Sequence, residues 1–188
     1  MKVINNWDLK WEKYNKTFEE YSDILSWKVW NIDFYDLLLV RNFKWWWAII
    51  SSTINDTNNK LKVYNSLFAL VNEDFDNNLL IATKVMDLSN SVENQIPGFK
   101  NSYLSALLSL MFPRLFPIMD KFVLYGTWIL SEYKTDTQKE MSKENYIKLM
   151  IFLEKHKWKT LRDLDKIYFT KWKLKQIELL WKIKNKKK

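Results

Sequence analysis

The sequence predicts an all-α protein with about seven to nine helices. No segment of useful length alternates polar and apolar residues, as a half-buried strand would. Apolar residues instead recur three and four positions apart, which places them on one face of a helix. All 3 prolines and both glycines lie between positions 97 and 126. Because proline and glycine mark backbone turns, the rest of the chain is expected to be helices with polar connections.

Three or four helices are expected before these central breaks. Two of them begin at capping signatures, Thr17-Phe18-Glu19-Glu20 for the first and Asn31-Ile32-Asp33 for the second. Apolar spacing then predicts a third helix over 61–71 and a fourth over 79–86.

Asparagine-rich stretches are expected to form loops, because asparagine favours turns. They lie at 55–60 and 77–78. Beyond the central breaks, apolar spacing predicts helices over 120–133 and 146–153. A further capping signature at 160–163 is expected to open the last helix.

A single all-α domain is expected over residues 1–181, followed by a basic tail at 182–188. The longest apolar run, 104–112, is shorter than the roughly 20 residues that span a bilayer. The N-terminus lacks the apolar core of a secretion signal. Without cysteine there are no disulfides or Cys-ligated metals, and the single histidine, His156, argues against a zinc site. We therefore expect a cytoplasmic monomer with no membrane partner and no bound metal.

The net charge of +8 is typical of a protein that binds nucleic acid. However, 5 lysines lie in the last 7 residues, and without them the chain carries +3. The 3 arginines are few beside the many lysines and asparagines, a bias that an AT-rich gene would also produce. Charge alone therefore leaves nucleic-acid binding open.

The chain has 11 tryptophans and 2 glycines, whereas average usage predicts roughly 13 glycines. One hypothesis is that some tryptophans are glycine in the living organism, because its codon UGA is read as glycine. The alternative is a genuinely aromatic-rich protein. In that case the consecutive Trp45, Trp46 and Trp47 could stack on a base, although clustered aromatic residues more often belong to a core.

Residues 92–112 carry the motif that indicates a function. Ile96-Pro97-Gly98-Phe99-Lys100 predicts a tight turn between two helices. The stretch resembles the helix–hairpin–helix of the DNA glycosylase superfamily, whose members remove oxidised bases such as 8-oxoguanine or alkylated bases. Further on, Phe116-Pro117-Ile118-Met119-Asp120 is similar to the Phe-Pro-x-x-Asp of the alkylated-base branch.

The resemblance implies double-stranded DNA as the partner. In the family, backbone N–H groups at the start of the hairpin's second helix bind a phosphate, and hairpin carbonyls can hold a monovalent cation. An aspartate that opens the next helix stabilises positive charge on the sugar while the base leaves, which makes Asp120 the catalytic candidate. The DNA-binding candidates are Gly98, Lys100, Asn101 and Ser102, with Arg114 and Lys121 as nearby charges.

Two positions depart from the family pattern. Lys100 replaces the second hairpin glycine, and Ser102 replaces the lysine that forms a Schiff base in bifunctional members. Because serine cannot form an imine, an active enzyme would be a monofunctional DNA N-glycosylase without lyase activity, a hydrolase of DNA repair. Two alternatives stay open, a non-catalytic DNA-binding module and an all-α interaction protein. Asp120 would then be only a helix cap.

Overall fold

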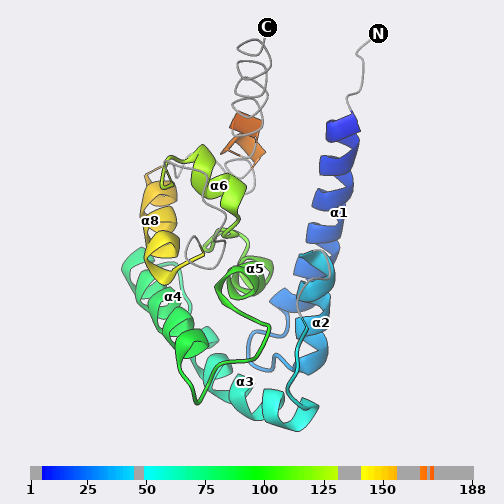
Figure 1. Ribbon diagram of the computed structural model, residues 1–188, viewed down its shortest axis with the longest axis vertical. Coiled ribbons are helices and arrows are strands. Elements are labelled where there is room, and N and C mark those ends of the chain that lie inside the picture. The colour runs from blue at the N-terminus through cyan, green and yellow to red at the C-terminus, as the bar shows by residue number, and fades with distance from the viewer. Residues whose placement is uncertain (1–5, 45–48, 131–140, 156–165, 169, 172–188) are drawn as a thin grey trace, which may run out of the picture.

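The computed structural model describes residues 6–44, 49–130, 141–155, 166–168 and 170–171, with backbone alone for 6–11. The regular structure of these residues is entirely helical, which confirms the predicted all-α class. Residues 166–168 and 170–171 are also helical. The labelled helices are α1 (Asn6–Ser26), α2 (Phe34–Phe43), α3 (Ile54–Phe68), α4 (Phe75–Asn90), α5 (Asn101–Met111), α6 (Lys121–Gly126) and α8 (Lys143–Glu154) (Figure 1).

Helix α5 lies at the centre of the fold, in contact with α1, α2 and α4 (Figure 1). Asn101 and every residue from Leu104 to Met111 are buried, so this helix meets other elements on all sides of its last two turns. Helix α4 packs in turn against α3 and α8. The buried residues form one hydrophobic cluster that extends from Phe18 in α1 to Tyr168 near the end of the described chain.

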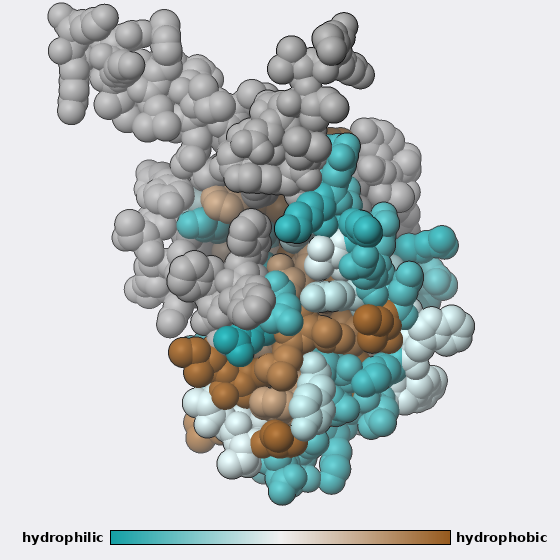
Figure 2. Space-filling view, turned by 90° about the vertical axis from the view of Figure 1, so that its right-hand side faces the viewer, coloured by the Kyte–Doolittle hydropathy of each residue, from teal (hydrophilic) through white to brown (hydrophobic). Residues whose placement is uncertain are grey.

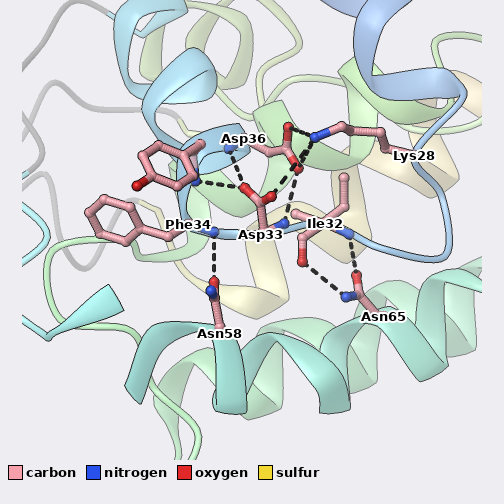
Figure 3. A network of polar contacts seen from close by, with 8 residues as sticks. Lys28, Ile32, Asp33, Phe34, Asp36, Asn58 and Asn65 are labelled. Carbon is pink, nitrogen blue, oxygen red and sulfur yellow. Dashed lines mark hydrogen bonds and ion pairs between the residues drawn. The ribbon is translucent and has the colours of Figure 1, made fainter. Parts of the chain in front are cut away.

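Polar side chains hold the start of α2 (Figure 3). Asp33 caps this helix as predicted, because its carboxylate accepts the backbone N–H groups of Tyr35 and Asp36 at 2.7 and 3.2 Å. The Asp36 carboxylate completes a capping box by accepting the backbone N–H of Asp33 at 3.0 Å. It also accepts a 2.8 Å hydrogen bond from Lys28, and this bond raises the pKa of Lys28.

Two asparagines of α3 bind the backbone where α2 begins (Figure 3). Asn65 accepts the backbone N–H of Ile32 at 3.1 Å and donates to its carbonyl at 3.0 Å. Asn58 accepts the backbone N–H of Phe34 at 2.8 Å. These three bonds join α3 to the N-terminal end of α2 and satisfy backbone groups that no helix of their own satisfies.

The predicted asparagine loops are therefore wrong. Residues 55–60 lie in α3, which begins at Ile54 behind the N-cap Thr53, and Asn77 and Asn78 lie in the first turn of α4. The amide of Asn77 donates to the Leu70 carbonyl at 2.9 Å. The amides of Asn58 and Asn77 thus satisfy backbone groups in other segments, a use that the turn preference of asparagine does not reveal.

Two other predicted boundaries are also wrong. Thr17 does not begin a helix but lies inside α1. Its hydroxyl donates to the carbonyl of Lys13, one turn earlier in the same helix, at 3.0 Å. The helix predicted over 120–133 ends at Gly126, and residues 127–130 are not helical. The helix predicted over 146–153 is confirmed as α8. The capping signature at 160–163 and the tail at 182–188 lie outside the described residues.

The surface on the side of α1 and α2 exposes hydrophobic residues among polar ones (Figure 2). Ile24 of α1 is 48 % exposed, for example, and Tyr35 of α2 is 62 % exposed. Among the described residues, no helix is long and apolar enough to cross a membrane.

Replacing Asn65 with alanine should destabilise the protein by about 1–3 kcal/mol, because both polar groups of the buried Ile32 backbone lose their partner. Urea unfolding measures this loss. The matched control is Asn59→Ala on the same helix, where the side chain is exposed and only accepts from Lys62. It should change the free energy of unfolding by about 0.5 kcal/mol or less. Equal losses in the two variants would contradict the role given to Asn65.

Candidate functional site

A tight turn precedes α5, as predicted from the Pro-Gly pair. The backbone N–H of Phe99 donates to the Ile96 carbonyl at 2.9 Å, and Gly98 has a φ of +83°. Proline at the second position and a positive φ at the third are the features of a type II turn. Glycine adopts such a φ without steric cost, which explains the residue at position 98.

The prediction of a helix directly before this turn is wrong. Helix α4 ends at Asn90, and residues 91–100 form an irregular connection. The Ser91 hydroxyl closes the helix end by donating to the Leu88 carbonyl at 2.9 Å, and it accepts the backbone N–H of Asn94 at 3.1 Å. Pro97 also disfavours a helical conformation at the residue before it. The two helices are therefore present, but the connection between them is longer than expected.

One face of Gly98 lies against the chain's own backbone. A Cβ built at this position would come within 1.9 Å of the Ile49 carbonyl oxygen, far closer than real Cβ contacts. The close approach that a glycine permits is here used by the segment that follows α2. The other glycine, Gly126, has the same role, because its Cβ would come within 2.1 Å of the Tyr168 carbonyl oxygen.

Helix α5 begins without a side-chain cap. Lys100 occupies its N-cap position, is exposed and makes no capping hydrogen bond. Its carbonyl accepts the backbone N–H groups of Tyr103 and Leu104 at 2.9 and 3.0 Å. Among the described residues, the backbone N–H groups of Asn101 and Ser102 have no acceptor. The helices α2, α3, α4, α6 and α8 are each capped by a side chain, from Asp33, Thr53, Asp74, Asp120 and Ser142 respectively.

The side chain of Asn101 is directed into the protein. It accepts a hydrogen bond from the Ser89 hydroxyl at the end of α4 and donates one to the Met141 carbonyl at 2.9 Å. The residue is only 7 % exposed. Asn101 therefore joins α4 and the segment before α8 to the start of α5, and only its backbone N–H remains for a ligand.

Two serines of α5 bind the peptide groups of Met119. The Ser102 hydroxyl donates to the Met119 carbonyl at 3.2 Å. The buried Ser105 hydroxyl accepts the Met119 N–H at 2.9 Å and donates to the Ser102 carbonyl at 2.9 Å. Met119 directly precedes Asp120, the N-cap residue of α6. These bonds therefore hold the N-terminal end of α6 against α5. The sequence places these serines three positions apart, on one face of a helix, but does not indicate their partner in a later segment.

A third hydroxyl holds the same segment from α8. The Tyr146 hydroxyl donates to the Pro117 carbonyl at 3.1 Å. Complete burial raises the pKa of Tyr146, so its phenol stays protonated and available as a donor. The extended chain from Phe116 to Met119 is thus buried and bonded to both α5 and α8.

Asp120 is the N-cap residue of α6. One carboxylate oxygen accepts the backbone N–H of Phe122 at 2.7 Å. The other lies 3.8 Å from the Lys44 ammonium, an ion pair whose lysine side chain is only 11 % exposed. The Asp120 side chain is itself 34 % exposed. The cap expected as the alternative to catalysis is therefore present, and Lys44 is a neighbour that the sequence does not indicate.

The remaining candidates lie at opposite ends of α5. Lys121 opens α6 beside Asp120, with its ammonium 5.2 Å from the centre of the Phe122 ring. Lys121 follows Met119 by two residues, and Met119 is bonded to Ser102 in the first turn of α5. The backbone of Lys121 therefore lies near the N-terminal end of α5. Arg114 is exposed in the turn after the C-terminal end of α5. A helix of 11 residues rises about 16 Å, so the backbones of Arg114 and Lys100 are far apart.

Among the described residues, no group of three or more His, Cys, Asp and Glu side chains could hold a metal ion. His156 lies outside the described residues. Comparisons with protein-family models, curated proteins and solved structures found no match to this chain.

Replacing Ser105 with alanine should cost about 1–3 kcal/mol of stability, because the buried Met119 N–H is left without an acceptor. Thermal or urea unfolding measures the loss. Ser66→Ala is the control, since that exposed hydroxyl bonds only to Val63 of its own helix. A loss at Ser105 no larger than the loss at Ser66 would mean that the bond to Met119 contributes nothing.

Proposed function

We propose that this chain binds double-stranded DNA through the phosphate backbone, at the N-terminal end of α5. The observation that carries the proposal is the missing side-chain cap. Behind a proline–glycine turn, α5 presents the backbone N–H groups of Asn101 and Ser102, which have no acceptor among the described residues. Such donors, at the positive end of a helix dipole, suit a phosphate group.

The nearby charges support the same proposal. Lys100 is exposed at the N-cap position, where the family pattern has glycine, and Lys121 opens the adjacent α6. Lysines at these positions would attract the DNA backbone without reading its sequence. Asn101 and Ser102 would contribute their backbone N–H groups alone, because their side chains are bonded within the protein. Arg114, at the far end of α5, would contact a different phosphate or none.

Base excision by Asp120 is the second candidate. The partial exposure of this carboxylate supports it, since a sugar must come close to the oxygen that stabilises its charge. The cap bond to Phe122 and the ion pair with Lys44 favour a structural role instead. We therefore place the non-catalytic DNA-binding module ahead of the monofunctional glycosylase. A protein that binds no DNA would be an all-α interaction protein.

Binding to duplex DNA should weaken steeply as salt rises from about 50 to about 200 mM, because phosphate contacts release counterions. Lys100→Glu should weaken binding to every sequence alike and lower the salt dependence by about one phosphate contact. Fluorescence anisotropy with two unrelated duplexes measures both effects. Lys62→Glu is the matched control, an exposed lysine on α3 with the same charge change. Equal effects of the two variants would mean that the N-terminal end of α5 takes no part in DNA binding.

Asp120→Asn tests excision on duplexes that carry an oxidised or an alkylated base. In a working enzyme this change should slow base removal on the order of 10²-fold or more, because the negative charge beside the sugar is lost. The helix cap should survive, since asparagine caps a helix about as well as aspartate, whereas the ion pair with Lys44 is lost. With Ser102 in place of the lysine, borohydride should trap no protein–DNA adduct. If Asp120→Asn removes the base as fast as the unchanged protein does, Asp120 has no catalytic role and serves only as a helix cap.

A further inference from the structure

The turn after α6 places a tryptophan in a backbone conformation that favours glycine. Thr127 is the C-cap residue of α6, and Trp128 follows it with a φ of +63°. Among the described residues, Trp128 is the only residue other than glycine with a positive φ. Helices commonly end on a residue in this left-handed conformation, and that residue is usually glycine because a Cβ is disfavoured there. A bulky aromatic residue at this position is an outlier.

Two more tryptophans lie in the turn that ends α1. Trp27 and Trp30 follow the last helical residue, Ser26, in a stretch closed by a 3.0 Å bond from the Lys28 N–H to the Leu25 carbonyl. Their side chains are 88 % and 72 % exposed. Glycine is strongly favoured in turns directly after a helix, but neither of these tryptophans has the positive φ seen at Trp128, so the argument here rests on their place in the turn and their exposure.

The three tryptophan side chains that the structure describes take no part in the core, whereas many phenylalanines and tyrosines do. Trp128 is 67 % exposed, so all three tryptophan side chains that the structure describes lie mostly in solvent. Phe68 and Tyr64, by contrast, are completely buried. Tryptophan is normally well buried, because its large apolar ring stabilises a core. These three tryptophans therefore lie in exposed turns and contribute little to the core.

We infer that Trp27, Trp30 and Trp128 stand where the living organism inserts glycine, because it reads the codon UGA as glycine. The composition supports this independently of the geometry, since 2 glycines and 11 tryptophans together number the roughly 13 glycines that average usage predicts. The inference does not depend on DNA binding. It does bear on the interface, because glycine at 45–47, outside the described residues, would remove three aromatic rings that could stack on a base.

The direct test is the gene together with the protein purified from its own organism. We expect TGA at all three codons, and peptide mass spectrometry should find glycine at positions 27, 30 and 128. A TGG codon at any of the three, or tryptophan in the natural protein, overturns the inference.

A second test uses the recombinant chain and isolates the backbone argument. Trp128→Gly should raise the midpoint of thermal unfolding by about 2–5 °C, because glycine adopts a positive φ without strain. Trp128→Ala is the matched control, since it removes the exposed ring but keeps a Cβ, and it should give little or no increase. If glycine gives no larger increase than alanine, the left-handed conformation does not require glycine and the inference fails.

Discussion

Burial of the last two turns of α5 on all sides is the constraint on which the rest of the fold depends. A helix in the middle of a core must satisfy every polar side chain from within the protein, because an unpaired buried group costs about 1–3 kcal/mol. Asn101 does so by bonding to α4 and to the segment before α8, and Ser105 by accepting the N–H of Met119. The polar residues of α5 therefore hold α4, the segment before α8 and Met119 in place. Because Met119 directly precedes the N-cap residue of α6, the N-terminal end of α6 is held as well.

The same constraint explains the environment of Asp120. With Met119 bonded by α5 and Pro117 bonded by Tyr146, the carboxylate can reach the first N–H groups of α6 and the ammonium of Lys44. The lysine offsets the negative charge on the side of the fold where we place a DNA phosphate. This arrangement suits backbone recognition at α5, whereas catalysis would use a carboxylate whose two oxygens already have partners.

Errors in the sequence-based prediction share a physical cause. Asn58 and Asn77, predicted to lie in loops, belong to helices in which their amides bond to backbone groups of other segments. Thr17 resembles a cap but lies within α1, where the helix itself provides a carbonyl for its hydroxyl. A local preference for turns or caps is only a few tenths to about one kcal/mol, and a tertiary hydrogen bond of similar strength reverses it.

The sequence by itself determined the helical class, because spacing of apolar residues at three and four depends on the helix alone. It also determined the turn at Gly98, the caps at Asp33 and Asp120, and helix α8, since each follows from residues within one turn of the feature. Only the tertiary structure decided which α5 side chains face inward, that Lys44 lies beside Asp120, and that Ile49 covers Gly98. These contacts join segments far apart in the chain, and no local preference specifies them.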